Sequence, residues 1–392
     1  MEFYTRPSFF ILLAIAIVPA AILGFAGKRI KPYGITASLF FLGLLFSNSP
    51  SELGAFLLFL LVSSASAYAT LRAKRLSKNE QLTFRLSLAV TIAPLVIYKI
   101  AAVFDENLLG FLGISYITFK SVQVLIEIHD GLITELNPIN YLYFLIFFAP
   151  FTSGPVDRSK RFNEDANRTF SKEEYADMLA RGLMLLLIGA VYKTVIASIL
   201  YTGYTPTPLE GGLSGIAGAI KDSYMYGFYL FFDFAGYSLM AMGAGYCFGI
   251  KVPRNFNAPF LALDVKDFWN RWHISLSTWL RDFVFMRFVR WSMRHKVFPS
   301  RLQTACCGYL INFIIMGAWH GLTIDYLIYG LYYGVLMGLT DVYQKKSSFH
   351  KKHRKKRWYK ALQWAVTINL IMIGMSIFSG QMHLIIGGII HG

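Results

Sequence analysis

Charged residues are scarce in this sequence. They account for 15% of the 392 residues, whereas a soluble protein of this size carries about a quarter. Acidic residues are the scarcer kind, because 22 Asp and Glu accompany 38 Lys and Arg, which gives a formal net charge of +16. The low charge argues against a soluble globular enzyme and against a disordered chain. Since 55% of the residues are hydrophobic, we attribute the positive charge to loops that face anionic lipid or an acidic partner, and we expect no nucleic acid partner.

Cysteine is rare and the common catalytic motifs are missing. Cys247, Cys306 and Cys307 lie in apolar runs, so no disulfide framework is expected. The sequence contains no Gly-rich phosphate loop, no HExxH motif and no Gly-x-Ser-x-Gly elbow, so an ATPase, a zinc protease and an α/β-hydrolase are unsupported. The spacing of His350 and His353 suits a metal, but without a third ligand nearby we expect a solvated basic loop and predict no metal site.

Long apolar runs are abundant instead. Because a helix crosses a bilayer with about 20 apolar residues and lipid leaves no backbone group unsatisfied, we predict an all-α polytopic membrane protein with about ten or eleven transmembrane helices. We expect a single membrane domain over residues 1–392. The first run resembles a signal peptide, but the next run follows so soon that we interpret it as a retained helix. The predicted passes are residues 9–27, 33–47, 53–71, 86–104, 108–128, 139–152, 183–201, 224–250, 305–319, 324–342 and 361–378.

Lysine and arginine in the short loops predict the orientation. Residues 28–31 include three and residues 72–85 include five, whereas the alternate loops, 47–52 and 105–107, have none. The positive-inside rule then places the N-terminus outside the cell. Residues 345–360 include nine Lys and Arg and no acidic residue, so this segment is predicted to be cytoplasmic.

Residues 264–301 are rich in tryptophan and too charged for a helix that faces lipid. Asn270, His273, Ser277 and Arg281 follow steps of three and four, so on a helix they form a polar stripe. This pattern indicates a broken or interfacial helix that lines a wet cavity. A membrane-surface helix that only anchors the chain is an equally good interpretation, and for His273 the alternative is a packed, hydrogen-bonded imidazole.

The next segment, 286–296, alternates cations with apolar residues. Such a surface, with an apolar centre and a cationic rim, suits an acidic partner, and contact with anionic lipid headgroups is the alternative. The residues that we assign to partner binding are Met286, Arg287, Val289, Arg290 and Arg294.

His320 ends the apolar run 311–321. Ionisable groups at membrane depth are costly and mark functional paths by default, and a neutral imidazole can take up and return a proton near neutral pH. Gly317 and Gly321 leave room for a substrate or for close helix contact. The alternative is a core histidine bonded to a carbonyl. Four other polar residues in apolar runs are compatible with lining a channel, pairing or snorkelling: Lys120, Glu127, Lys193 and Asp233.

Four motifs resemble the membrane-bound O-acyltransferase (MBOAT) family. They are residues 232–238 (FDFAGYS), 255–257 (NFN), 268–277 (FWNRWHISLS) and 319–321 (WHG), within a motif-dense core of about 153–342. The resemblance implies a helical bundle with broken or interfacial helices around a central funnel. It also implies that His320 is the catalytic histidine and that His273 is the second histidine near the reaction path. The residues we expect in the substrate tunnel are Trp269, Asn270, Ser277, Trp319 and Asp233.

Within that family the chain is most similar to the branch that D-alanylates teichoic acids in Gram-positive bacteria. Residues 153–158 (SGPVDR) and 281–288 (RDFVFMRF) favour it over the branch that acetylates exopolysaccharides such as alginate. The resemblance implies a bacterial plasma membrane enzyme whose donor is the phosphopantetheine thioester of a small acidic D-alanyl carrier protein. It further implies a teichoic acid acceptor outside, other proteins of the same operon as partners, and no cofactor bound by the chain itself.

The expected chemistry is acyl transfer to a hydroxyl. We expect His320 to act as the general base, and His273 or Asn270 to donate to the oxyanion or orient the thioester. Two alternatives stay open. One is another reaction of the same family, such as O-acetylation of a cell-wall polysaccharide. The other is a transporter or flippase that uses the intramembrane His and Asp as proton relays.

Overall fold

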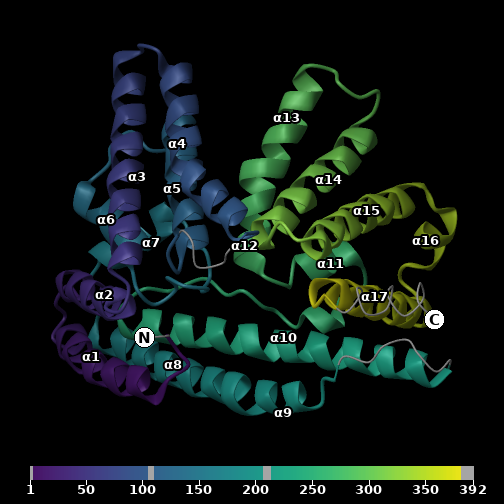
Figure 1. The fold of residues 1–392 in the computed structure, drawn as a ribbon, viewed down its shortest axis with the longest axis horizontal. Coiled ribbons are helices and arrows are strands. Elements are labelled where there is room, and N and C mark those ends of the chain that lie inside the picture. The colour runs from purple at the N-terminus through teal and green to yellow at the C-terminus, as the bar shows by residue number, and fades with distance from the viewer. Residues whose placement is uncertain (1–2, 105–109, 206–212, 381–392) are drawn as a thin grey trace. The chain divides into compact units, whose positions relative to one another are not determined.

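The computed structural model describes residues 3–104, 110–205 and 213–380, and over these residues the chain is helical and without strands (Figure 1). The prediction of an all-α protein is therefore confirmed. The loop 105–107, the first two residues of the expected pass 108–128, and the C-terminal residues 381–392 lie outside the described part.

The helices gather into two compact units, residues 1–190 with 236–254, and residues 191–235 with 255–392. The helix α10 (Leu213–Cys247) contributes to both. The remaining helices of the first unit are α1 (Pro7–Phe25), α2 (Lys31–Phe46), α3 (Pro50–Leu76), α4 (Glu80–Ala101), α5 (Ile114–His129), α6 (Pro138–Ile146), α7 (Ser159–Asn167) and α8 (Lys172–Ala190). Those of the second are α9 (Ala197–Thr202), α11 (Val265–Trp269), α12 (Ile274–Leu280), α13 (Met286–Arg294), α14 (Arg301–His320), α15 (Ile324–Lys346), α16 (Ser348–His353) and α17 (Arg357–Phe378).

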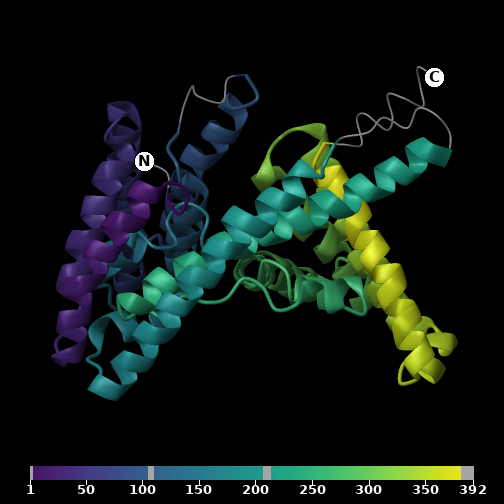
Figure 2. The ribbon, with the colours of Figure 1, turned by 90° about the horizontal axis from the view of Figure 1, so that it is seen from below.

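Six of the described helical segments are long and apolar enough to cross a membrane, so the chain is a multi-pass membrane protein. The segment Lys172–Thr202 joins α8 to α9 through a π-helical turn, Val191–Ile196. The others are α1, α3, α4, α14 and α17, and Figure 2 shows α17 as one uninterrupted helix. This number is smaller than the predicted ten or eleven because several expected passes form shorter or more polar helices. The expected pass 139–152, for example, contains only the nine-residue helix α6.

Polar residues inside the first unit are held by specific partners. Lys120 is buried and donates a hydrogen bond to the main-chain oxygen of Phe144, with 2.9 Å between the two atoms. Ser159 donates to the carboxylate of Glu127 at 2.8 Å. These contacts satisfy groups that would be costly to bury alone. Lys120 and Glu127 therefore have local partners within this unit, and they do not pair with each other.

The second unit is built on the pair α14 and α15, which lie side by side (Figure 1). Ser300 begins α14 with a capping box, in which its side chain accepts from the main-chain N–H of Gln303 and the Gln303 side chain accepts in return. The helix ends at His320. The short helices α11 and α12 precede this pair in the chain and contribute residues to the candidate site described next.

Candidate functional site

The expected polar stripe lies on a broken helix. The helix α11 ends at Trp269, and α12 begins at Ile274. Between them His273 adopts a left-handed backbone conformation, with φ of 44° and ψ of 50°, which is uncommon for a residue other than glycine. The prediction of a broken helix is confirmed. The single stripe, however, is wrong, because Asn270 precedes the break and Ser277 and Arg281 follow it, and His273 does not line the cavity that these three share.

Asn255 holds this turn in place. The N–H of Ile274 donates to the main-chain oxygen of Asn255 at 2.9 Å, and the hydroxyl of Ser275 donates to its side-chain oxygen at 2.5 Å. Asn255 is fully buried. Its oxygen atoms therefore accept hydrogen bonds from groups at the N-terminus of α12 that have no partner within the helix. Sequence reasoning used the NFN motif only as a family signature and missed this positioning role.

The imidazole of His273 is enclosed by aromatic rings. It meets the ring of Phe234 edge-on at 4.7 Å between centroids, and the indole of Trp319 at 6.2 Å. Its Nε2 atom is buried without a hydrogen-bond partner among the described residues. His273 lies outside the long apolar helices, and burial, followed by the nearby imidazole of His320, lowers its pKa to about 3. The ring is therefore neutral at physiological pH.

His320 is the last residue of α14 and is surrounded by a second group of aromatic rings. The ring centroid of Trp319 lies 4.5 Å from it and that of Phe378 lies 4.9 Å from it. Tyr326 and Tyr329 from α15 lie at 5.9 and 6.0 Å. The indole of Trp319 thus lies near both imidazoles, so the two histidines share one neighbourhood within the second unit.

Glycine residues allow α14 and α15 to approach closely near His320. A methyl group on Gly317 would overlap the main-chain oxygen of Tyr326, and one on Gly330 would overlap that of Phe313. Small residues at helix contacts are typical of membrane proteins, where close backbone packing drives association. Of the two interpretations offered for Gly317, close helix contact is the one that the structure confirms.

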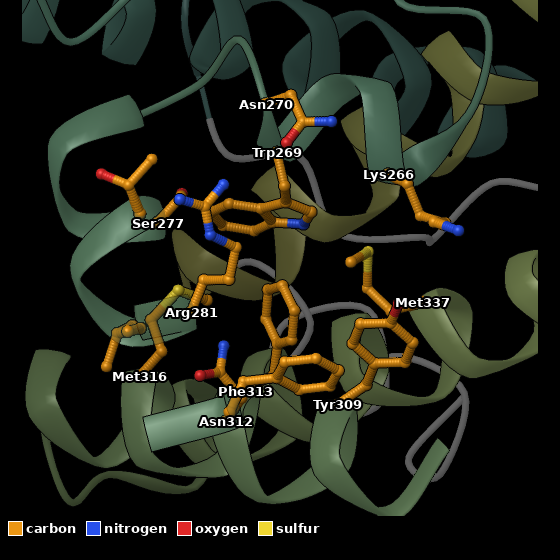
Figure 3. Close-up of a pocket in the computed structure, with 13 residues that line it drawn as sticks. Lys266, Trp269, Asn270, Ser277, Arg281, Tyr309, Asn312, Phe313, Met316 and Met337 are labelled. Carbon is orange, nitrogen blue, oxygen red and sulfur yellow. The ribbon is translucent and has the colours of Figure 1, made fainter. Parts of the chain in front are cut away.

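A cavity of about 180 Å³ lies beside these helices (Figure 3). Three of the expected tunnel residues, Trp269, Asn270 and Ser277, line it, and so does Arg281. On α14 it reaches Met316, one helical turn before His320. The other residues that line it are Lys266, Thr278, Leu280, Phe285, Tyr309, Asn312, Phe313 and Met337. The expected tunnel residues Trp319 and Asp233 are not among them.

Two polar atoms in the cavity walls have no partner among the described residues. They are the indole nitrogen Nε1 of Trp269, a donor, and the side-chain oxygen Oδ1 of Asn312, an acceptor. Both side chains are more than nine-tenths buried. An unpaired buried polar group costs about 1–3 kcal/mol, so a polar group bound in the cavity would gain by pairing with these atoms. Asn312 was not singled out in the sequence, although an amide in an apolar run is a usable signal.

Asp233 has a different environment from the one expected. Its carboxylate pairs with the ammonium group of Lys193, with 2.5 Å between nitrogen and oxygen. Both residues belong to the second unit. For Lys193 and Asp233 the sequence left open whether they line a channel, pair or snorkel, and the structure shows that they pair with each other.

The segment assigned to partner binding forms α13, which follows the cavity wall directly. Phe285 lines the cavity and Met286 begins the helix. Arg290 and Arg294 are exposed, and with Arg287 they share one helix face. Val289 is half-buried, because one of its methyl groups lies toward Gly308 of α14. The cationic part of the expected surface is thus accessible, whereas Val289 faces the neighbouring helix.

No group of three His, Cys, Asp or Glu side chains is arranged to hold a metal ion within residues 3–104, 110–205 and 213–380.

Comparison with known proteins identifies the family. A profile of the membrane-bound O-acyltransferase family matches residues 47–383. The chain belongs to this family. It is therefore an O-acyltransferase, and the MBOAT assignment agrees with the helical, multi-pass structure.

Of three curated proteins similar to the chain, two resemble it over nearly its whole length, and the third resembles it over about two thirds. A teichoic acid D-alanyltransferase of Bacillus subtilis is 41% identical, over 96% of this chain and 98% of its own. The protein of the same name from Streptococcus thermophilus is 38% identical, over 97% of this chain and 95% of its own. A probable alginate O-acetylase of Pseudomonas aeruginosa is 29% identical, over 69% of this chain and 49% of its own.

The close approach of α14 and α15 can be tested with two alanine substitutions. Gly317→Ala should lower stability by about 1–3 kcal/mol, because the new methyl group has to push main-chain atoms apart. Gly338→Ala is the matched control on the same seam, since its nearest neighbours are side-chain atoms of Cys306 at an ordinary 3.6 Å. Thermal unfolding of the detergent-purified variants measures both. Equal unfolding temperatures for the two variants would contradict this account.

Proposed function

We propose that this O-acyltransferase moves D-alanine from the phosphopantetheine thioester of a carrier protein to a hydroxyl acceptor on the route to teichoic acid. The observation that carries the proposal is the pairing of His320 and His273 around Trp319 beside a cavity with unpaired polar walls. Full-length similarity to teichoic acid D-alanyltransferases supports the choice of acyl group. The alginate O-acetylase relatives fit less well, because the match covers only about half of their length.

The cavity suits the pantetheine arm of the donor. A secondary amide carries one N–H donor and one C=O acceptor, and Asn312 Oδ1 and Trp269 Nε1 offer the complementary pair. The cavity reaches Met316, and four residues of α-helix advance about 6 Å to His320. We infer that the arm enters along this wall and that the thioester lies beyond Met316, close to the imidazole.

The reaction needs one proton to move twice. His320 removes the proton from the acceptor hydroxyl, and the oxygen attacks the thioester carbonyl carbon. The tetrahedral intermediate collapses with breakage of the C–S bond, and the protonated imidazole returns the proton to the leaving thiolate. His273 or Asn270 donates a hydrogen bond to the oxyanion, and an Nε2–H tautomer of His273 has that atom available. Because the thioester is already activated, no ATP or metal is required, and the phosphopantetheine belongs to the partner.

Replacement of His320 tests the assignment of the base. His320→Ala should fold and insert normally but lower D-alanyl transfer by roughly 10²–10⁴-fold or more, the usual contribution of general-base catalysis. The measurement is consumption of the carrier thioester by purified full-length protein. His353→Ala, in the basic helix α16, is the matched control and should retain full activity. Wild-type transfer by His320→Ala would remove the base assignment.

We further propose that the acidic carrier docks on α13. The cations Arg287, Arg290 and Arg294 share one face, and the helix continues directly from the cavity wall at Phe285. A cationic surface beside the cavity would steer an acidic protein and align its arm with the opening.

Charge reversal tests this docking surface. Replacing Arg287, Arg290 and Arg294 by Glu should weaken carrier binding, most strongly at low salt, because the lost attraction is electrostatic. Reversing Lys351, Lys352 and Lys355 removes the same charge from a different basic segment and should have little effect. Carrier affinity measured at two salt concentrations decides. If both triple variants bind the carrier equally well, the docking surface lies elsewhere.

We propose the bacterial plasma membrane as the location, with the N-terminus outside. The alternation of basic and uncharged loops supports this orientation. Other proteins of teichoic acid D-alanylation are the expected partners on the acceptor side. We also propose that the two compact units act together as one MBOAT domain over 1–392, since the family profile runs through both of them.

A further inference from the structure

A groove on the second unit lies apart from the reaction cavity. Its volume is about 320 Å³, and it lies between α15 and α17, with the start of α11 contributing Leu263, Asp264 and Val265. The residues that α15 contributes, from Leu336 to Gln344, follow steps of three and four, and so do those that α17 contributes, from Tyr359 to Leu370. Each helix therefore presents one face to the groove.

One part of the groove is apolar and open. Leu339, Leu362 and Val366 line it and are about half exposed, with 58%, 49% and 51% of their surfaces accessible. Leu336 and Leu370 extend the same lining. Aligned aliphatic side chains along two helices match the shape and chemistry of an alkyl chain.

Three cations lie close in the chain to the residues that line the polar end of the groove, Gln344 and Tyr359. The helix α15 ends with Lys346, and the first turn of α17 contains Arg357 and Lys360. All three are exposed, and none takes part in an ion pair within the described part of the chain. Trp358 is half exposed beside them, as an aromatic anchor at a membrane interface would be. An anionic headgroup would find unengaged positive charge here.

The acidic residues nearby are already engaged. Asp264 accepts one hydrogen bond from the main-chain N–H of Asp267 and another from the side chain of Gln344, both at 2.8 Å. Asp341 is buried between the ammonium groups of Lys266 and Lys345, each 2.6 Å away. The two lysines offset the negative charge of Asp341, whereas Asp264 keeps its charge and is held by neutral donors.

We propose that this groove binds one anionic glycerophospholipid from the leaflet on the α16 side. An acyl chain lies along Leu339, Leu362 and Val366, and the phosphate lies at Lys346, Arg357 and Lys360. The long apolar lining and the cationic end together distinguish a lipid from a free anion, which would use only the cations, and from a neutral lipid, which would use only the apolar lining.

The bound lipid would bear on the reaction cavity through α11. Val265 at the start of this helix lines the groove, whereas Lys266 and Trp269 line the cavity. The five-residue helix α11 thus lines both the groove and the cavity.

A lipid that binds only the folded state stabilises that state by mass action. The anionic lipid should therefore raise the unfolding temperature of the protein as well as bind to it.

Native mass spectrometry of the purified full-length protein tests the proposal. Phosphatidylglycerol should be retained as one molecule per chain in preference to phosphatidylcholine with the same acyl chains. Lys346→Gln with Lys360→Gln should weaken phosphatidylglycerol binding by roughly twenty-five-fold, since each cation near an anionic headgroup contributes about fivefold. Leu339→Trp, which fills the apolar part, should abolish the one-to-one adduct and the rise in unfolding temperature.

Two control variants and one competitor separate the alternatives. Lys351→Gln with Lys352→Gln removes the same charge from α16, and Leu331→Trp adds the same indole to α15 at a position that is 49% exposed and outside the groove. Neither should change lipid retention, and millimolar inorganic phosphate should not displace the lipid. Equal retention of the two lipids, equal losses in test and control variants, or displacement by phosphate would each overturn the proposal.

Discussion

The close contact between α14 and α15 is the constraint on which the site depends. Gly317 and Gly330 leave no space for a side chain between the helices, and so the two backbones fix each other's position. Everything that faces His320 or the cavity from these helices is placed by this contact. Asn312 and Met316 come from one helix, and Tyr329 comes from the other. In a membrane, where lipid is as apolar as the side chains, such close packing replaces the hydrophobic effect as the source of precise geometry.

The second feature of the site is polar atoms left unpaired among aromatic rings. Trp269, His273 and Asn312 each bury an atom without a partner in the described structure. Each such atom costs about 1–3 kcal/mol while it is unpaired, and a substrate group that pairs with it would recover that cost. The aromatic rings around His273 bury its imidazole, which strengthens hydrogen bonds formed there during the reaction. The unpaired atoms of these residues therefore lower the stability of the fold while they make hydrogen bonds available for the reaction.

Much of this architecture could be predicted from the sequence. The features that could not be predicted are those for which the helical spacing of side chains carries no information. The helical membrane fold follows from hydropathy, and the break in the segment 264–301 follows from its charge. Asn270, Ser277 and Arg281 line one cavity, but not through a single helical stripe, because Asn270 precedes the break and the other two follow it. The left-handed turn at His273 breaks the helix between them, and no spacing rule contains that turn.

Two other differences have physical reasons of the same kind. Asp233 was expected in the tunnel, but a lysine 40 positions earlier in the chain pairs with it, and such a contact arises only when the chain folds. Expected passes such as 139–152 became short helices, because composition alone does not determine where a helix ends. Sequence alone singles out His320, since an imidazole in an apolar run is rare enough to be informative, whereas His273 is singled out by the polar pattern of its segment and by the family motif.

The most direct test of the central claim, that His320 and not His273 is the base, is the pH dependence of single-turnover acyl transfer. Burial keeps the pKa of His273 at about 3, so this ring stays neutral through the range in which an ordinary imidazole, with a pKa near 6.5, becomes protonated. Because His273 does not titrate in that range, the account predicts that a folded His273→Asn variant keeps the acid limb of the wild-type pH profile at a lower rate. Loss of the acid limb in His273→Asn would contradict it.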